Sequence, residues 1–477
     1  MSAPWLIGLL SMVCACGAMA ADSSPPVAPT QPAGDSPFVK HFDFASVGAV
    51  VVYVPDQVDA GTDVVLLASG DGGWNPQMID IATRIQATGR IVVGFSTPEY
   101  LKRAAASDSK CTNSAGDLVG LSQFVQRQLG SHVYRTPVLV GYASGASLAY
   151  VVAAQAPINA FVGSIAIGFC PVLALEKPLC RRGALRKSQI KGTAGDLRPT
   201  GRVVTPLEVL PVPAGGSCEA GEAAAFMQDV DNSHVMPMLE ANRADVDAWV
   251  GDFFSAYDAL VAKRPVASAS KTAELAGLPL IERPVETASR TLIVMLSGDG
   301  GWSTLTERVT DELNASGLPV VGWNTLKYFW TAKTPEHASA DLAAIIRYFS
   351  DAWHTQDVIL TGYSMGADVL PAIVNRLPPA EQRRIRSVVL MAPGRATDYE
   401  FHISGWLQHV PKDAQPIAPE VENMPADIRL TCIYGSDEAQ RSLCTQIDAG
   451  KPGLTLKELP GAHHFDGDYE SLARLVR

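Results

Sequence analysis

One segment of the sequence occurs twice. Residues 64–74 read VVLLASGDGGW, and residues 292–302 read LIVMLSGDGGW. Two further pairs of segments follow in the same order in each half of the chain: 89–95 with 317–323, and 138–142 with 358–363. Because the repeated unit takes up about half of the 477 residues, the sequence predicts two copies of one domain in tandem.

Each copy alternates short apolar runs rich in β-branched residues with longer segments of helical spacing. Such runs are typical of strands buried on both faces, and the alternation predicts βαβ units with helices on both sides of a mostly parallel sheet. The expected class is therefore α/β, with two tandem domains that each consist of a mostly parallel sheet flanked by helices. The predicted boundaries are a signal peptide at 1–21, a flexible lead-in at 22–37, an N-terminal domain at 38–261, a linker at 262–272 and a C-terminal domain at 273–477.

The first residues have the pattern of an export signal. An apolar run from Trp5 to Val13 and the sequence Ala18-Met19-Ala20 precede the first charged residue, Asp22, which predicts a cleaved secretory signal peptide and a periplasmic protein. Lipid attachment at Cys16 is the alternative.

An exported chain with an even number of cysteines favours disulfides. Without the leader, six cysteines remain. Cys432 and Cys444 are alone in the second half, so they are expected to pair with each other unless the halves are cross-linked. The other four allow three pairings: Cys111, Cys170, Cys180 and Cys218.

The second copy contains a Gly-x-Ser-x-Gly motif. An apolar run at 358–360 leads into Gly362-Tyr363-Ser364-Met365-Gly366, and a helical pattern follows. A serine between a buried strand and a helix is the nucleophile elbow of α/β-hydrolases, in which small flanking residues permit a sharp turn. A packing-driven tight turn is the alternative. We predict that Ser364 is a nucleophile.

A nucleophilic serine needs a base and an acid that orients it. Asp437 follows the apolar run 428–434, and His463 lies after the next run, 454–459, which is the chain order expected of this fold. Asp437 is the predicted acid, with Glu438 as the alternative, and His463 is the predicted base, with His464 supporting its loop. A metal site on the two histidines and the nearby carboxylates is a further hypothesis, but the serine hydrolase interpretation is preferred. Neither a metal nor a cofactor is therefore expected.

The Gly-rich loop at 297–302 follows an early strand, and in this fold a loop at that position supplies an oxyanion donor. Backbone N–H groups of Asp299 or Gly300, together with that of Met365, are the predicted oxyanion hole. A tight turn with Trp302 capping the core is the alternative.

The first copy lacks these chemical groups. Its elbow reads Gly141-Tyr142-Ala143-Ser144-Gly145, so Ala143 stands at the position of the serine. No carboxylate directly follows the run 207–210. The first domain is predicted to be catalytically inactive.

The paired SGDGGW loops, the GYSMGAD elbow at 362–368 and the GAHHFDGDY segment at 461–469 resemble the AcvB/VirJ family of bacterial virulence proteins. The resemblance covers nearly the whole mature chain, and the double-length form is more similar to AcvB than to the shorter VirJ. It implies a periplasmic α/β-hydrolase whose C-terminal domain cleaves lysyl-phosphatidylglycerol, and a connection with type IV secretion proteins. By motif, the family's nucleophile, acid and base fall on Ser364, Asp437 and His463.

A lysyl ester carries two ammonium groups, so carboxylates are expected around the serine. The candidates are Asp299, Asp368, Asp466 and Asp468, some of which would instead be solvated loop acids or helix caps. Asp368, Asp466 and Trp302 are the predicted substrate-binding residues.

Net charge restricts the partners. With 49 acidic and 38 basic side chains the formal charge is −11, which argues against nucleic acid as a partner. The segment 177–202 is nevertheless rich in Lys and Arg, which predicts peripheral contact with anionic lipid or, alternatively, a solvated loop. The remaining alternatives for function are a general carboxylesterase or peptidase, and a binding protein without catalysis.

Overall fold

The computed structural model describes residues 38–477 except 181–184, 186–189, 192–194, 202, 213–217, 219, 238–245, 264–272 and 403–413. Three predicted features lie outside the described residues: the signal peptide with Cys16, the lead-in, and most of the linker. Much of the basic segment 177–202 also lies outside them. Among the described residues, no helix has the length and apolar character needed to cross a membrane.

The first copy forms an eight-stranded sheet in the order β1-β2-β4-β3-β5-β6-β9-β10. β1 and β2 are antiparallel to their neighbours, and all the other pairs are parallel. The strands are β1 (Val39–Phe44), β2 (Gly48–Tyr53), β3 (Val64–Ala68), β4 (Ile91–Phe95), β5 (Val138–Tyr142), β6 (Ser164–Ile167), β9 (Leu207–Leu210) and β10 (Ser233–Val235). A separate hairpin joins β7 (Ile190–Lys191) and β8 (Asp196–Leu197).

The second copy forms a seven-stranded sheet in the order β11-β13-β12-β14-β15-β18-β19, in which only the β11–β13 pair is antiparallel. The strands are β11 (Leu280–Arg283), β12 (Thr291–Leu296), β13 (Val320–Trp323), β14 (Asp357–Tyr363), β15 (Ile385–Met391), β18 (Arg429–Gly435) and β19 (Leu454–Leu459). β16 (Ala396–Thr397) pairs with β17 (Gln415–Pro416) apart from it. The predicted tandem α/β architecture with mostly parallel sheets is confirmed.

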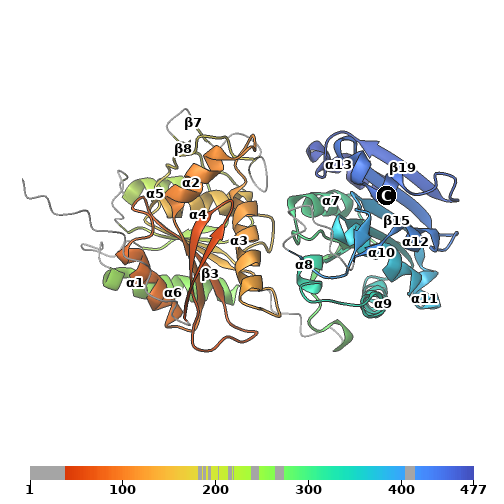
Figure 1. Ribbon diagram of the computed structural model, residues 1–477, viewed down its shortest axis with the longest axis horizontal. Helices are drawn as coiled ribbons and strands as arrows, with labels where there is room; N and C mark the ends of the chain where they lie inside the picture. The colour runs from red at the N-terminus through yellow and green to blue at the C-terminus, as the bar shows by residue number, and fades with distance from the viewer. Residues whose placement is uncertain are drawn as a thin grey trace, which may run out of the picture. The chain divides into compact units, whose positions relative to one another are not determined.

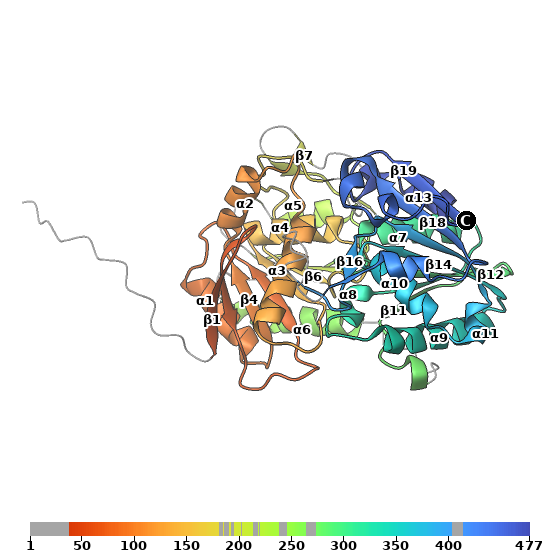
Figure 2. The same ribbon diagram turned by 45° about the vertical axis from the view of Figure 1, so that its right-hand side comes forward.

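Helices cover both faces of each sheet (Figures 1 and 2). The helices of the first copy are α1 (Pro76–Gln86), α2 (Thr97–Ala106), α3 (Ser114–Gln128), α4 (Ser144–Gln155), α5 (Ala220–Met227) and α6 (Val246–Ala262). Those of the second are α7 (Thr304–Ala315), α8 (Thr325–Tyr328), α9 (Pro335–Ala352), α10 (Met365–Asn375), α11 (Pro379–Gln382), α12 (Ala418–Glu422) and α13 (Tyr469–Val476). Short 3-10 turns are η1 (Ala273–Leu275), η3 (Ser436–Arg441), η4 (Leu443–Thr445) and η5 (Phe465–Gly467).

Strand β12 shows why its apolar run has no polar face. Leu292, Val294 and Leu296 pack into the core under α9 and α10. Ile293 and Met295 point to the opposite face, into the core under α7 and α13. Because successive side chains of a strand point to opposite faces, a strand covered on both sides must be apolar throughout.

Three disulfides are present: Cys111–Cys180, Cys170–Cys218 and Cys432–Cys444. The predicted pairing of Cys432 with Cys444 is confirmed, and the other two bridges select one of the three open pairings. Disulfides persist in oxidising compartments, which agrees with an exported protein.

We expect replacement of both Cys432 and Cys444 by alanine to lower the free energy of unfolding by about 2 to 4 kcal/mol, because the bridge restricts the unfolded chain. The two cysteines are 12 residues apart, and both are fully buried beside β18. Urea unfolding of the oxidised proteins measures the effect. An unchanged midpoint would show that the bridge contributes nothing to stability.

Candidate active site

Ser364 occupies the turn between β14 and α10. Its backbone has φ 52° and ψ −122°, a conformation that residues other than glycine rarely adopt. Its N–H donates to the Met391 carbonyl of the neighbouring strand at 2.9 Å, which holds the turn at the carboxyl end of the sheet. Strained backbone of this kind persists where the surrounding structure enforces it, and it is frequent at active sites.

The two glycines of the motif permit this turn by their lack of a side chain. A Cβ on Gly362 would lie 2.3 Å from the Gly366 carbonyl oxygen, and a Cβ on Gly366 would lie 2.4 Å from the Ser297 carbonyl oxygen. Both positions therefore exclude any larger residue. This close packing of β14, α10 and the end of β12 brings the Gly-rich loop against the serine.

His463 bonds Glu438 rather than Asp437. The His463 Nδ1 lies 3.0 Å from one Glu438 carboxylate oxygen and 3.3 Å from the other. Asp437 is exposed, its carboxylate accepts from the Ser436 hydroxyl at 3.2 Å, and it does not line the cavity that contains Ser364. The geometry thus favours Glu438, the alternative acid, over Asp437 as the residue that orients His463.

The reason lies in the turn after β18. The Asp437 N–H donates to the Gly461 carbonyl at 3.0 Å, which ties this turn to the histidine loop. The chain then continues as the 3-10 turn η3, in which successive side chains point in different directions. The side chain that faces His463 is therefore that of the next residue, Glu438.

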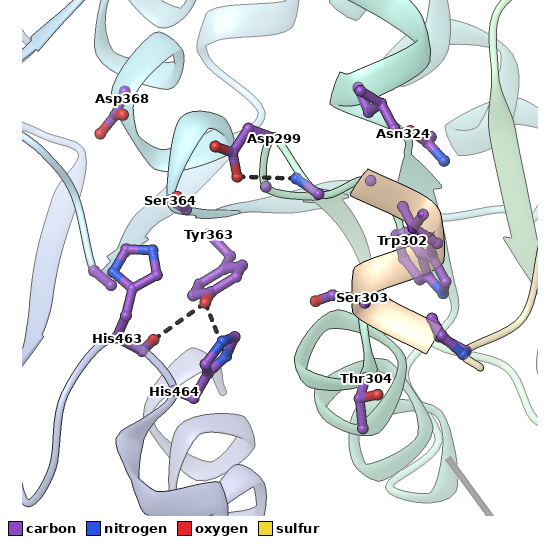
Figure 3. Close-up of a pocket in the computed structure, with 18 of the residues that line it drawn as sticks. Asp299, Trp302, Ser303, Thr304, Asn324, Tyr363, Ser364, Asp368, His463 and His464 are labelled. Carbon is purple, nitrogen blue, oxygen red and sulfur yellow. Dashed lines mark hydrogen bonds between the residues drawn. The ribbon is translucent and has the colours of Figure 1, made fainter. Parts of the chain in front are cut away.

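The imidazole of His463 points toward Ser364 in Figure 3. Since Nδ1 is engaged by Glu438, Nε2 is the nitrogen left to exchange a proton with the serine. Burial alone would lower the pKa of His463, but the hydrogen bond and charge of Glu438, with the charges of Asp299 and Asp368, outweigh it and raise the pKa. The imidazolium is thus stabilised where a serine hydrolase needs it.

Tyr363 supports the histidine loop from the elbow. Its hydroxyl lies 3.2 Å from the His463 carbonyl, to which it can donate, and 3.1 Å from His464 Nδ1. Its ring also contacts the His463 ring, with 5.2 Å between centroids. His464 therefore contacts Tyr363, and through this contact it can support the loop. The sequence does not indicate this role of Tyr363, because the second position of the Gly-x-Ser-x-Gly motif is not tied to one function.

The Gly-rich loop lies against the elbow, but one predicted oxyanion donor is occupied. The Gly300 N–H donates to the carboxylate of Asp299 at 2.9 Å, as Figure 3 shows. The turn itself is closed by the Gly301 N–H donating to the Gly298 carbonyl at 3.0 Å. The N–H of Met365, the first residue of α10, lies at a helix N-terminus, which favours a developing negative charge.

Ser364, His463 and Glu438 line one cavity of about 820 Å³ together with Asp299 and Asp368. Burial is the main cause that raises the pKa of both aspartates, and it raises that of Asp368 to about 7. The Asp299 carboxylate accepts from the Gly300 N–H at 2.9 Å, and the Asp368 carboxylate accepts from the Gly394 N–H at 2.7 Å.

The other predicted substrate-binding residues differ in their surroundings. Asp466 is exposed and does not line the cavity, so its predicted contact with the substrate is not supported by this geometry. Asp468 caps α13 by accepting from the Ser471 N–H at 3.1 Å. Trp302 does line the cavity, but it is 3% exposed and packs on Gly322, where a Cβ would lie 2.3 Å from its ring.

The first copy keeps the backbone of this site. Ala143 has φ 53° and ψ −115°, close to the values at Ser364, and its N–H donates to the Ile167 carbonyl at 2.9 Å. Trp74 packs on Gly94 as Trp302 packs on Gly322. Because Trp74 has this place in a copy without the serine, packing alone accounts for the tryptophan.

The first copy also contains a histidine after its elbow, His234, which is paired with Glu208. It lies in β10 in register with Glu208 of β9, and its Nδ1 is 2.6 Å from the Glu208 carboxylate.

Among the described residues of both copies, no group of three or more His, Cys, Asp or Glu side chains could hold a metal ion.

Comparison with known proteins identifies a family. The sequence model of the bacterial virulence protein (VirJ) family matches residues 62–160 and 290–477, which together exceed half of the chain. A search of the curated proteins finds no match.

Similar solved structures each cover about one copy. Est1E from Butyrivibrio proteoclasticus is 14% identical, with 41% of this chain and 89% of that chain covered and a TM-score of 0.30. The esterase Pf2001 of Pyrococcus furiosus is 14% identical, with 42% and 88% covered and a TM-score of 0.30. LpqC, a poly(3-hydroxybutyrate) depolymerase from Bordetella parapertussis, is 16% identical, with 41% and 82% covered and a TM-score of 0.29.

Proposed function

The chain belongs to the bacterial virulence protein (VirJ) family, and from that premise we propose that it is a periplasmic serine hydrolase that cleaves the aminoacyl ester of lysyl-phosphatidylglycerol. The observation that carries the proposal is the strained Ser364 elbow in one cavity with a His463–Glu438 pair. A serine, a histidine and a carboxylate at one cavity are the groups that acyl transfer requires.

The proposed reaction has two steps. His463 removes the proton of Ser364 while the serine oxygen attacks the lysyl carbonyl, and Glu438 stabilises the imidazolium that forms. The ester C–O bond breaks, and the phosphatidylglycerol hydroxyl leaves with the proton from His463. Water, deprotonated by the same histidine, then cleaves the lysyl-enzyme to free lysine. The N–H of Met365 is the proposed donor to the oxyanion, with a second donor from the Gly-rich loop.

The cavity is lined by both acidic and basic side chains, which suits a substrate that carries both positive and negative groups. Asp299 and Asp368 lie on its wall and suit the ammonium groups of a lysyl ester. Lys327, Arg395 and Arg441 also line it and suit the phosphodiester of the same lipid. We propose that the protein acts at the membrane surface, where the basic segment 177–202 contacts anionic lipid.

The direct test is incubation of the purified chain with vesicles that contain lysyl-phosphatidylglycerol. We expect lysine and phosphatidylglycerol to appear in equal amounts, and 4-nitrophenyl butyrate, a neutral ester, to be a poorer substrate by kcat/KM. Faster turnover of the neutral ester would favour a general carboxylesterase. Absence of turnover on both, with no labelling by a fluorophosphonate, would favour a binding protein without catalysis.

A further inference from the structure

Asp368 is a carboxylate that the reaction scheme leaves without a task. It lies in the first turn of α10, one helical turn after Ser364, and it lines the same cavity (Figure 3). One of its oxygens accepts from the Gly394 N–H at 2.7 Å. Among the described residues, its other oxygen has no hydrogen-bond or ion-pair partner. That oxygen is therefore available to a group that enters the cavity.

Among the described residues, no lysine or arginine forms an ion pair with Asp368. The groups that act on its pKa are its own burial and the charge of Asp299, which raise it, and the Gly394 N–H and His463, which lower it. Tyr399, on the segment after β15, is the remaining titratable group coupled to it. A partly desolvated carboxylate with another carboxylate nearby is costly to ionise unless a cation pairs with it.

Two acids elsewhere in the second copy have such partners. Asp357 lies 2.8 Å from Arg290 and 2.7 Å from Arg386, and Glu420 lies 2.9 Å from Arg376. An acid that lacks a protein cation and lies in the cavity of the nucleophile differs from these structural ion pairs. The simplest source of the missing positive charge is the bound substrate.

We propose that Asp368 binds an ammonium group of the aminoacyl moiety and so makes the hydrolase selective for cationic acyl groups. The proposal rests on the proposed function, because it assigns a specificity-determining residue to the same cavity. The lysyl group brings its ammonium groups within a few bonds of the ester carbonyl that Ser364 attacks. A carboxylate one helical turn beyond the serine can pair with an ammonium without displacing the catalytic histidine.

The competing role for Asp368 is purely structural. An acid in the first turn of a helix is favoured by the helix dipole, and its bond to Gly394 fixes the loop after β15. Substitution by asparagine separates the two roles. Its amide oxygen still accepts from the Gly394 N–H, whereas its negative charge is removed.

The kinetic test compares Asp368→Asn on two matched lipids: lysyl-phosphatidylglycerol, and the same lipid with both lysyl amines acetylated. We expect KM for the cationic lipid to rise about 10- to 100-fold, the range for a lost charged hydrogen bond, while kcat/KM for the acetylated lipid changes less than about 3-fold. Glu307→Gln is the matched control, because burial also raises the pKa of Glu307 to about 7 but this acid does not line the cavity.

A binding measurement gives a readout that does not depend on turnover. In the Ser364→Ala background, calorimetry with lysinamide should show weaker binding when Asp368→Asn is added, and diacetyl-lysinamide should bind both proteins equally. Equal losses on both lipids, or no selective loss of lysinamide binding, would overturn the proposal. If Asp368→Asn reacts with a fluorophosphonate at the wild-type rate, the nucleophile is intact, so failure of the specificity proposal is distinguishable from failure of the proposed function.

Discussion

Ser364→Ala is expected to release lysine from lysyl-phosphatidylglycerol at least about 10⁴-fold more slowly than the wild-type chain, because no other group can form the acyl-enzyme. Labelling by a fluorophosphonate should be lost completely. Alanine already adopts the same backbone conformation at position 143 of the first copy, so the fold should tolerate the change. Circular dichroism and thermal unfolding check that it does. Undiminished lysine release would remove Ser364 from the mechanism.

The first copy supplies a matched control inside the same chain. Adding Ala143→Ser to Ser364→Ala should not restore labelling, although the elbow at position 143 has the right backbone geometry. The reason is that His234 is held by Glu208 across β9 and β10, so it is not positioned to activate a serine at the elbow. Recovered labelling would show that the backbone turn alone activates a serine.

The elbow geometry is retained in the copy that lacks the serine, which shows what the strain at this turn depends on. The serine is not required for it, because Ala143 has nearly the same φ and ψ. Glycine packing maintains the turn: a Cβ on Gly141 would lie 1.9 Å from the Gly145 carbonyl oxygen, much as at Gly362. The backbone therefore presents a side chain at this place in both copies, and only the second copy carries a serine there.

The elements with local signals could be predicted from the sequence. The repeat, the strands buried on both faces and the serine elbow all depend on residues that are close in the chain. The acid could not be decided in this way. Asp437 and Glu438 are adjacent, and the choice depends on a bond from Asp437 N–H to Gly461, a residue of a loop that follows the next strand. Sequence spacing carries no information on such a tertiary contact.

The acidic residues near the motifs show the same limit. Asp368 and Asp468 both follow motifs that the sequence singles out, yet one lines the cavity and the other caps α13. A helix cap has a local signal, because the capping aspartate accepts from the N–H of a residue three positions later. Asp468 and Ser471 have this spacing. The contact of Asp368 with Gly394 joins residues 26 positions apart, on either side of β15, and has no local signal.

Glu438→Gln is expected to lower kcat by about 10³- to 10⁴-fold, as loss of the acid does in other serine hydrolase triads, whereas Asp437→Asn should change it less than about 2-fold. Glutamine can still contact His463 Nδ1, but it cannot stabilise an imidazolium by its charge. The pair of variants therefore decides which of two adjacent acids orients the base. Comparable losses in both variants would contradict the assignment to Glu438.

The pH dependence of kcat/KM adds a readout that a merely structural role for Glu438 would not change. The pKa of His463 is raised, so in the wild-type chain the base becomes neutral, and activity appears, only as the pH rises past a value above the ordinary histidine pKa. Glu438 contributes to this rise through its hydrogen bond and its charge. Removing that charge should move the acid limb of the Glu438→Gln profile to lower pH, while the profile of Asp437→Asn coincides with that of the wild type. An acid limb that stays in place in Glu438→Gln would mean that the carboxylate does not act on His463.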